Sequence, residues 1–334
     1  MAAAKKLKIA DEKQVERFLT LELVRVTEQA AIAAARLRGR GDERAADQAA
    51  VEAMREELNL LPVRATVVIG EGDETEAPLL YVGDEVGTGK GPMLDIAVDS
   101  LEATTVCAKN LPNSMSLLAL AQPGCLLRTP NIYMEKIAVG PGYPPGLVDL
   151  DAPATDMIAA VARAKGVPVH EVTACILDRP RHARLIAEVR ATGAAIRLIG
   201  DGDIAGVIHA TNPEETGIDI YLGSGGAPEG VLAAAALRCT GGQMLGRLMF
   251  SGDDQVRKAK AMGIDDLRRV YTLEDMAKGD VLFAATGVTD GNFLTGVRFR
   301  PDSIHTHSIV MRSASGTVRS VKAVHRNDAQ HGGQ

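Results

Sequence analysis

The strongest constraint on the fold is a segment in which a β-rich run, a helix-forming run and a second β-rich run follow one another directly. The three runs are VTACILD (172–178), RPRHARLIAEVRATG (179–193) and AIRLIGDGD (195–203). Two strands joined by a helix are the repeating unit of a parallel sheet. A β-rich run, a Gly-rich loop and a helix-forming run follow again over residues 218–242. We therefore predict an α/β arrangement in this half of the chain.

The remainder of the chain predicts a second domain of α+β character. At about 150 residues per domain, a chain of 334 residues is expected to form two domains. Helix-forming runs cover residues 11–38 and 43–60, and short β-rich runs follow at 65–69 and 94–98. The last sixty residues are mostly β-rich. We place the boundary near residue 170, which gives an N-terminal α+β domain over 1–170 and a C-terminal α/β domain over 171–334.

Composition and charge exclude several classes of protein. Hydrophobic residues make up 46% and charged residues 24%, which is typical of a folded globular chain. Aromatic residues are only 3%, Trp is absent and the net charge is −6, so neither nucleic acid nor an anionic membrane is an expected partner. The longest apolar run, residues 231–237, is far shorter than a membrane span, and the first ten residues lack the apolar core of a secretory signal. We expect a cytoplasmic protein, and its four widely spaced cysteines are typical of reduced thiols.

Four carboxylates stand where strands or a helix would place them near one another. Asp47 shares the apolar face of the second predicted helix, Glu71 follows one β-rich run, and Asp99 and Glu102 follow the next. Each alone has an ordinary explanation, such as a turn, a helix cap or an ion pair of Asp47 with a nearby arginine. Together they would repel one another, and a divalent cation removes that penalty. Carboxylate oxygens select Mg²⁺ or Mn²⁺ over zinc.

Two further segments suggest binding of anions. Ser100 is expected to cap a helix whose first amides, from Ala103 to Thr105, would bind a phosphate group. Metal-binding acids beside a phosphate site are what metal-assisted phosphoryl hydrolysis requires. RPRH (179–182) places two guanidinium groups within four residues, which suits a second phosphate, although a solvated charge cluster is the alternative.

Seven motifs in this order resemble the class II fructose-1,6-bisphosphatases of the lithium-sensitive, metal-dependent phosphatase superfamily. The motifs are GRGDERAADQAAVEAMR, VVIGEGDETEAPLLYVGDEVGTGKG, DIAVDSLEATT, YMEK, RPRH, DGD and GSGGAPEG, and the likeness runs from about residue 20 to 325. The resemblance implies a layered α/β/α/β sugar-phosphatase fold, a requirement for Mg²⁺ or Mn²⁺, and hydrolysis of the 1-phosphate of fructose 1,6-bisphosphate. It also implies that sedoheptulose 1,7-bisphosphate is a further substrate in some bacterial members.

The resemblance assigns expected roles to individual residues. The metal ligands fall on Asp47, Glu71, Asp99, Glu102 and Glu229. The catalytic positions are Glu71, Asp99 and Thr104, with Thr104 orienting or helping to deprotonate water. The substrate contacts fall on Glu102, Ala103, Thr104, Tyr133, Arg179, Pro180, Arg181, Asp201, Gly202, Asp203 and Gly226.

Several departures from the family pattern bear on activity, among them Ser100 in place of the usual Pro. Ala103 replaces the usual Gly, which would be strained if this position needs a positive φ. Thr75 stands where the family has Asp, and Glu43 where it has Lys. The expected partner is a small sugar bisphosphate, and a homodimer or homotetramer is the expected assembly. The alternatives are another sugar or inositol phosphatase of this fold, or a catalytically weakened relative that still binds the ligand.

Overall fold

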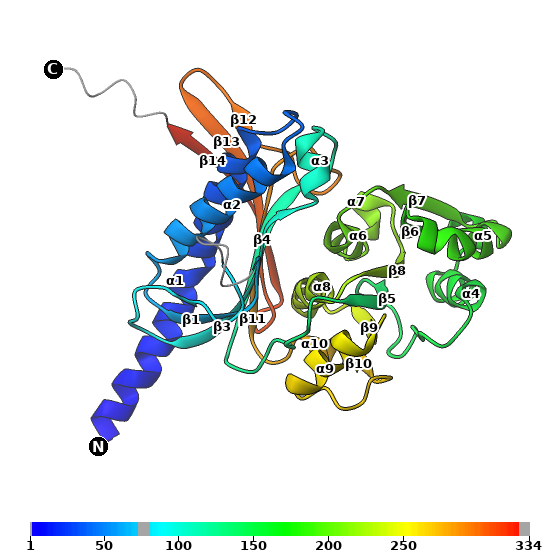
Figure 1. Cartoon of the computed structure of the whole chain (residues 1–334), viewed down its shortest axis with the longest axis horizontal. Helices are drawn as coiled ribbons and strands as arrows, with labels where there is room; N and C mark the ends of the chain where they lie inside the picture. The colour runs from blue at the N-terminus through cyan, green and yellow to red at the C-terminus, as the bar shows by residue number, and fades with distance from the viewer. Residues whose placement is uncertain (1, 73–79, 327–334) are drawn as a thin grey trace. The chain divides into compact units, whose positions relative to one another are not determined.

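The computed structural model describes the backbone of residues 2–72 and 80–326, and their side chains from Phe18 onward (Figure 1). The chain forms two compact units, each with its own sheet. The first unit comprises Met1–Leu120, Leu282–Met311 and Val318–Gln334, and the second comprises Ala121–Val281 and Arg312–Thr317. Residue 170, where the sequence suggested a boundary, falls inside the second unit. The sequence predicts that the last sixty residues are rich in strands. It does not predict that these strands join the sheet of the first unit.

The first unit contains a sheet of eight strands with helices across one face. Its elements are α1 (Ala2–Ala35), α2 (Glu43–Leu58), β1 (Arg64–Ile69), β2 (Glu85–Val86), β3 (Met93–Glu102), α3 (Thr104–Ala108), β4 (Met115–Ala121), β11 (Val281–Gly287), β12 (Arg298–Phe299), β13 (Ser303–Arg312) and β14 (Thr317–Arg326). The strand order is β12-β13-β11-β4-β3-β1-β2, with β14 paired to β13. β1 and β3 are parallel, so both run toward the edge at which Glu71 and Asp99 are found.

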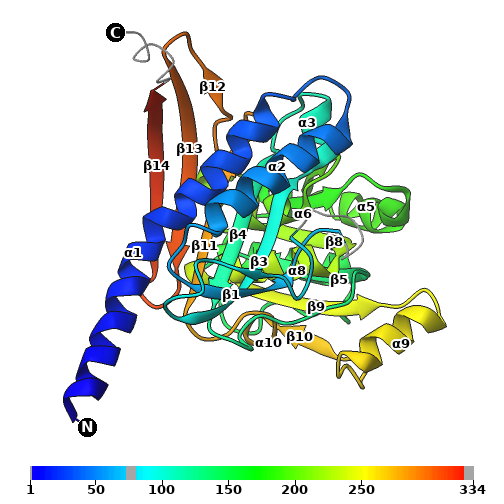
Figure 2. The same ribbon diagram turned by 60° about the vertical axis from the view of Figure 1, so that its left-hand side comes forward.

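Helix α2 forms where the sequence predicts and fixes Asp47 against the sheet. Asp42 caps it, because its side chain accepts a hydrogen bond of 3.0 Å from the amide of Ala45. Ala50, Val51 and Met54 are buried on one helix face, and they join the core that α1 and α2 form with β1 and β3. Figure 2 shows the two helices lying side by side across this face.

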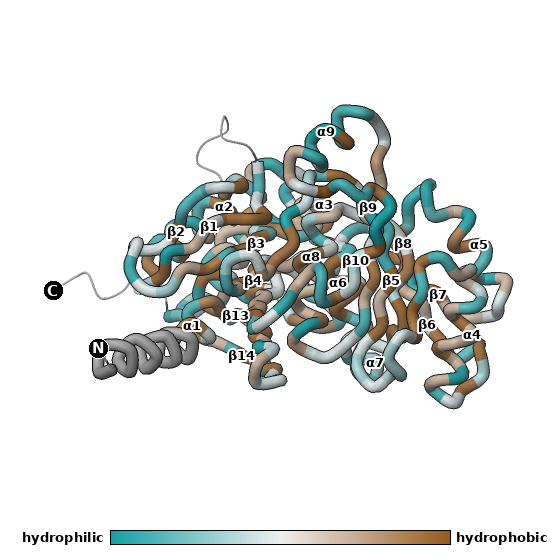
Figure 3. The backbone as a smooth tube through the Cα atoms, turned by 90° about the horizontal axis from the view of Figure 1, so that it is seen from below, coloured by the Kyte–Doolittle hydropathy of each residue, from teal (hydrophilic) through white to brown (hydrophobic). Residues whose placement is uncertain are grey.

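The second unit is a six-stranded sheet covered on both faces. Its elements are β5 (Tyr133–Val139), α4 (Ala154–Lys165), η1 (Val169–Glu171), β6 (Thr173–Leu177), η2 (Pro180–His182), α5 (Ala183–Ala191), β7 (Ala195–Ile199), α6 (Asp203–His209), α7 (Pro213–Thr216), β8 (Ile220–Gly226), α8 (Ala227–Thr240), β9 (Gln243–Met249), α9 (Asp253–Ala261), β10 (Val270–Thr272) and α10 (Leu273–Met276). The strand order is β10-β9-β5-β8-β6-β7. Helices α4 and α5 pack on one face, and α6 and α8 lie on the other (Figure 3).

The strand–helix–strand prediction is confirmed by the pairing of β6 and β7, which are parallel and joined by α5. The two-sheet, mixed α/β architecture is also confirmed. The first helix is longer than expected at its start, since it begins at Ala2 rather than near residue 11. Over residues 2–72 and 80–326, no helix combines the length and the apolar character that crossing a bilayer requires.

Candidate active site

Asp47 and Glu71 are brought together in the first unit. Asp47 lies on α2 and Glu71 follows β1, and their carboxyl groups are close enough to share a hydrogen bond. Asp47 makes no ion pair with Arg40 or Arg44 in the described part of the chain. The expectation that Asp47 forms an ion pair with a nearby arginine is therefore not met.

Ser100 holds Glu71 in place. Its backbone amide and its hydroxyl both donate to Oε1 of Glu71, each at 2.5 Å. Ser100 is fully buried within β3 and does not cap a helix, contrary to the sequence-based expectation, because the strand continues to Glu102. The residue that precedes α3 and caps it is Ala103.

The environment of this pair disfavours two negative charges. Burial raises the pKa of Glu71 to about 7, the negative charge of Asp47 adds to the effect, and the hydrogen bonds from Ser100 oppose it. Burial likewise raises the pKa of Asp47. Two carboxyl groups in contact in this partly buried environment therefore hold a proton between them unless a cation takes its place.

Asp99 and Glu102 lie near the end of strand β3, which is followed by α3. Glu102 is buried, and its backbone carbonyl accepts a hydrogen bond of 3.0 Å from the hydroxyl of Ser114. Among the residues that the structure describes, no three His, Cys, Asp or Glu side chains are arranged to hold a metal ion. Of the expected ligands in this unit, the structure thus brings Asp47 and Glu71 into contact. Asp99 and Glu102 are placed on the neighbouring strand.

Ala103 adopts the left-handed conformation for which the family pattern has glycine. Its φ is +62° and its ψ is +59°, and its side chain is buried. Its carbonyl accepts hydrogen bonds from the amides of Val106 and Cys107, which makes this turn the start of α3. Thr104 is the first residue of that helix. Thr75, the other departure near the expected metal ligands, lies outside the described residues.

The second unit contains a buried ion pair that the sequence analysis did not identify. Lys136 is 1% exposed, and its ammonium group donates to Asp203 and, at 2.7 Å, to the carbonyl of Gly226. Asp203 is the first residue of α6, after Gly202 at φ +81°. The lysine in YMEK was a signal for this pair, because an isolated cation in an apolar strand needs a buried counter-charge.

Glu229 lies near this pair at the start of α8. Its carboxylate packs against Gly226, where an added Cβ would lie only 1.7 Å from Oε2. Oε2 is buried and has no hydrogen-bond partner among the described residues. Burial raises the pKa of Glu229, and the charge of Asp203 contributes in the same direction while that of Lys136 opposes it. An orphaned, buried carboxylate oxygen fits a bound cation.

The two arginines of RPRH occupy different positions. Arg179 forms an ion pair of 3.4 Å with Asp201, while Arg181 lies over the ring of Tyr133, 4.8 Å from its centroid. Pro180 begins the short helix η2 between them. Across the β5–β8 ladder Tyr133 is paired with Gly226. The second unit therefore groups Tyr133, Arg181 and Gly226 at one end of β5 and β8.

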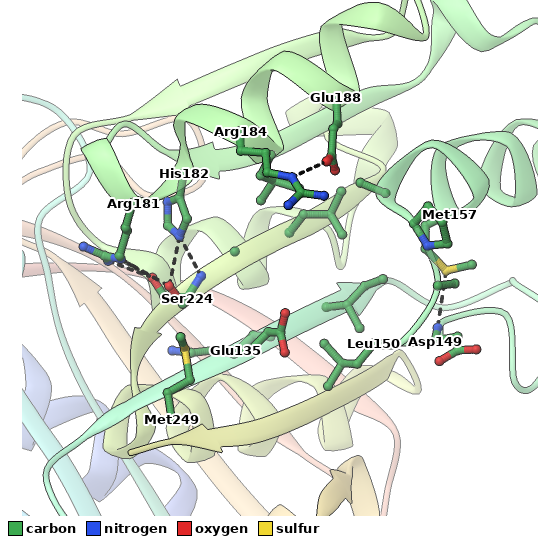
Figure 4. A pocket seen from close by; sticks show the side chains of 18 residues that line it. Glu135, Asp149, Leu150, Met157, Arg181, His182, Arg184, Glu188, Ser224 and Met249 are labelled. Atoms are coloured by element: carbon green, nitrogen blue, oxygen red, sulfur yellow. Dashed lines mark hydrogen bonds and ion pairs between the residues drawn. The ribbon is translucent and has the colours of Figure 1, made fainter. Parts of the chain in front are cut away.

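A cavity of about 340 Å³ opens beside Arg181 (Figure 4). Arg181, His182 and Ser224 line one end of it, and Glu135 and Met249 lie below them in the view. His182 is buried, and both of its ring nitrogens are engaged by hydrogen bonds. The sequence analysis named His182 only as part of RPRH and gave it no role.

Comparison with known proteins supports the family resemblance over nearly the whole chain. Residues 17–325 match the family described as "Bacterial fructose-1,6-bisphosphatase, glpX-encoded". A protein of Synechococcus sp. (strain JA-3-3Ab), named D-fructose 1,6-bisphosphatase class 2/sedoheptulose 1,7-bisphosphatase, is 43% identical over 341 residues, covering 95% of this chain and 98% of that protein. The Escherichia coli (strain K12) protein named Fructose-1,6-bisphosphatase 1 class 2 is 42% identical over 328 residues, covering 94% of this chain and 97% of that protein.

A solved structure of an extragenic suppressor from Pyrococcus furiosus aligns over 58% of this chain and 70% of that one, at 13% identity. Its TM-score is 0.31, which is too low to support an argument. The family match over residues 17–325 and the 42–43% identity to relatives covered over nearly their whole length do support a family assignment. This chain belongs to the bacterial, glpX-type fructose-1,6-bisphosphatase family.

Proposed function

We propose that this chain is a metal-dependent sugar bisphosphatase that hydrolyses the 1-phosphate of fructose 1,6-bisphosphate and also accepts sedoheptulose 1,7-bisphosphate. The observation that carries the proposal is the contact between the half-buried carboxyl groups of Asp47 and Glu71. Family membership and the names of the relatives support the substrate class. The protein acts in the cytoplasm as a homodimer or homotetramer, which light scattering of the purified protein would test.

The residues of the first unit suit the metal and the scissile phosphate. Asp47 and Glu71, with Asp99 and Glu102 on the adjacent strand, would hold Mg²⁺ or Mn²⁺, since all offer the carboxylate oxygens that these cations prefer. In the second unit, Glu229 has a buried oxygen without a hydrogen-bond partner among the described residues, and this oxygen would suit a cation. When bound, the cation supplies activation of water and neutralises charge on the phosphate.

The turn after β3 supplies the chain's own contribution to the reaction. The backbone at Ala103 and Thr104 stabilises negative charge on the phosphate oxygens through its amides. Thr104 orients the attacking water with its hydroxyl. Ser100 acts behind them, because its two hydrogen bonds keep Glu71 at the edge of β1.

The residues of the second unit suit the sugar and its other phosphate. Arg181 offers a guanidinium group for a dianionic phosphate, with Tyr133 beneath it. Arg179 and Pro180 shape the same loop. Sugar hydroxyls are hydrogen-bonded by the carboxylates and backbone of the DGD loop and by the backbone of the glycine loop, at Asp201, Gly202, Asp203 and Gly226.

The test is phosphate release from fructose 1,6-bisphosphate, sedoheptulose 1,7-bisphosphate and inositol monophosphate, each with Mg²⁺, with Mn²⁺ and after chelation by EDTA. We expect release from the two sugar bisphosphates only, loss of release after chelation, and recovery on adding either metal. Release from inositol monophosphate alone would assign the chain to a different phosphatase activity, and release that survives chelation would remove the metal from the proposal.

A catalytically weakened relative is the second candidate, and the backbone of Ala103 favours it. A non-glycine residue at φ +62° is strained where backbone approaches phosphate. Restoring the family residues with Thr75→Asp and Ala103→Gly should then raise a low rate. If the rate is negligible and both restorations leave it unchanged, this second explanation fails.

A further inference from the structure

The hydrogen bonds around the ring of His182 are compatible with only one tautomer of the imidazole. The backbone amide of Ser224 donates to Nε2 at 2.9 Å, and an amide can only donate, so Nε2 carries no proton. Nδ1 therefore carries it and donates to the carbonyl of Leu177 at 2.8 Å. The hydroxyl of Ser224 is also within reach of Nε2, at 3.1 Å.

His182 takes the place of a missing strand neighbour of β8. β6 pairs with β8 at Ile220 and Tyr221, so the described ladder between them ends before Ser224. On the other side β8 pairs with β5, where Ser224 is opposite Glu135. In an antiparallel ladder the amide and the carbonyl of one residue point to the same side, and both of these groups in Ser224 point away from β5.

The carbonyl of the same residue holds Arg181. Nη2 of Arg181 donates to Ser224 O at 2.7 Å, and Nε lies 3.2 Å from both Ser224 O and Ser224 Oγ. The guanidinium plane is fixed from below by the ring of Tyr133. Nη1 forms no hydrogen bond to a described residue, so the two protons of that nitrogen can be directed to a ligand.

The ring of His182 is closely packed, and its surroundings favour the neutral form of the imidazole. Gly223 has φ +148°, and a Cβ at this position would lie 3.2 Å from two atoms of the imidazole. Burial lowers the pKa of His182, and the charges of Arg181 and Arg179 act in the same direction. The Leu177 hydrogen bond and the charge of Asp203 oppose them. Figure 4 shows the chain of contacts from His182 through Ser224 to Arg181 at the end of the cavity.

We propose that His182 is a positioning residue for the second phosphate of the substrate. Its Nε2 holds the amide of Ser224, and the carbonyl and hydroxyl of Ser224 then aim the guanidinium of Arg181. This inference rests on the proposed function. It assigns to His182 an effect on binding of the phosphate that is not hydrolysed, and no effect on the chemical step.

The test compares two amide substitutions that replace different ring nitrogens. In His182→Gln the side-chain oxygen reaches the position of Nε2 and keeps an acceptor for Ser224. In His182→Asn the amide nitrogen reaches the position of Nδ1 and keeps the bond to Leu177, but no acceptor remains for Ser224. Losing one such hydrogen bond is worth about tenfold in affinity. We expect His182→Asn to raise KM for fructose 1,6-bisphosphate about tenfold with kcat unchanged, and His182→Gln to restore KM to within about threefold of wild type.

A binding measurement isolates the same phosphate from the reaction. Fructose 6-phosphate, titrated calorimetrically into the metal-free protein, carries only the phosphate assigned to Arg181. His182→Asn should weaken its binding about as much as KM rises, and Arg181→Ala sets the upper limit of the effect. Ser224→Ala, which removes the hydroxyl and keeps the backbone bonds, should give a smaller change in the same direction.

Two results would overturn the inference. One is a His182→Asn protein that melts like wild type and binds both ligands normally. The other is equal loss in the Asn and Gln variants, which would show that the acceptor at Nε2 is not what matters. If His182→Asn does not fold, an unchanged KM in Ser224→Ala overturns the inference instead. A wild-type protein that releases no phosphate from any sugar bisphosphate, yet binds fructose 6-phosphate with these differences, would contradict the proposed function and leave the positioning role intact.

Discussion

The Asp47–Glu71 pair of the first unit and the RPRH region of the second unit differ in how their charges are balanced. In the first unit, two carboxyl groups meet at Asp47 and Glu71, and the described residues supply no basic partner for either. In the second unit, Lys136 neutralises Asp203, and the arginines of RPRH are held by Asp201 and Ser224. A site with uncompensated negative charge must take its cation from solution, whereas a site with arginines on a fixed frame is prepared for an anion. Under the proposed function, the first region would suit a metal ion and the second region an anionic phosphate.

The two regions should also respond oppositely to acid in the absence of metal. Since the pKa of Glu71 is raised in the folded state, the folded first unit binds a proton before the unfolded chain does, and it gains stability as pH falls from about 7 toward the ordinary value of 4.5. The pKa of His209 in the second unit is lowered to about 4, mainly by burial and secondarily by Arg197. That region loses stability as pH falls below 6.5, because the unfolded chain takes up the proton first.

The largest expected effect comes from the uncompensated carboxylate. Glu71→Gln should lower kcat more than about a thousandfold, because under the proposed function it would remove a metal ligand while preserving shape. The metal-free variant should not be less stable than wild type at pH 8, since the substitution also removes a buried charge. Phosphate release and thermal unfolding followed by circular dichroism measure both quantities. Glu85→Gln, which alters an exposed carboxylate on β2 of the same sheet, is the matched control, and an active Glu71→Gln enzyme would contradict the assignment.

In the second unit, removing the charge of Lys136 is expected to lower the free energy of unfolding. Lys136→Met leaves Asp203 buried without its counter-charge, which should cost about 3–5 kcal/mol of unfolding free energy. Urea titration checks this value. Lys258→Met breaks an exposed pair with Asp254 and should leave the free energy of unfolding nearly unchanged, because solvent screens this pair. The double variant Lys136→Met/Asp203→Leu should recover most of the loss, and a double variant as unstable as the single one would show that packing, and not charge, explains the effect.

The sequence predicts one of these two regions better than the other for a physical reason. Asp47 lies on an amphipathic helix and Glu71 follows a β-rich run, so their approach to each other could be expected from where these elements lie. Lys136 indicates that a buried counter-charge exists, but neither Lys136 nor His182 indicates which residue is its partner. These partners depend on strand register and on where β6 stops pairing with β8. The sequence predicts strain at Ala103 only if this position has a positive φ. It does not predict the φ itself, because that angle is set by the start of α3. The return of the last strands to the first sheet depends on tertiary pairing, which hydrophobic patterns do not specify.

The acid response of the second unit can be measured at His209. A lowering from 6.5 to about 4 corresponds to about 3 kcal/mol of stability lost between those pH values. Urea unfolding of the metal-free protein at a series of pH values should show this slope in wild type and a shallower one in His209→Gln. The exposed His170 provides the control substitution, His170→Gln, which should leave the slope as it is. Equal slopes in all three proteins would remove His209 from the comparison.

The smallest expected effect tests the strain in the first unit. An L-residue in the left-handed region costs about 1–2 kcal/mol, and glycine avoids this cost but loses more entropy on folding. Ala103→Gly should therefore stabilise the protein by about 1 kcal/mol, measured by thermal unfolding. Asn110→Gly, at φ +52°, is the matched control and should gain less, because Asn tolerates this region. Ala103→Gly should also lower KM for the sugar bisphosphate, because a Cβ would no longer stand beside the amides proposed to bind phosphate. A less stable Ala103→Gly protein would mean that burial of the Ala103 methyl group outweighs the backbone strain, and the first unit would then be relaxed at this turn.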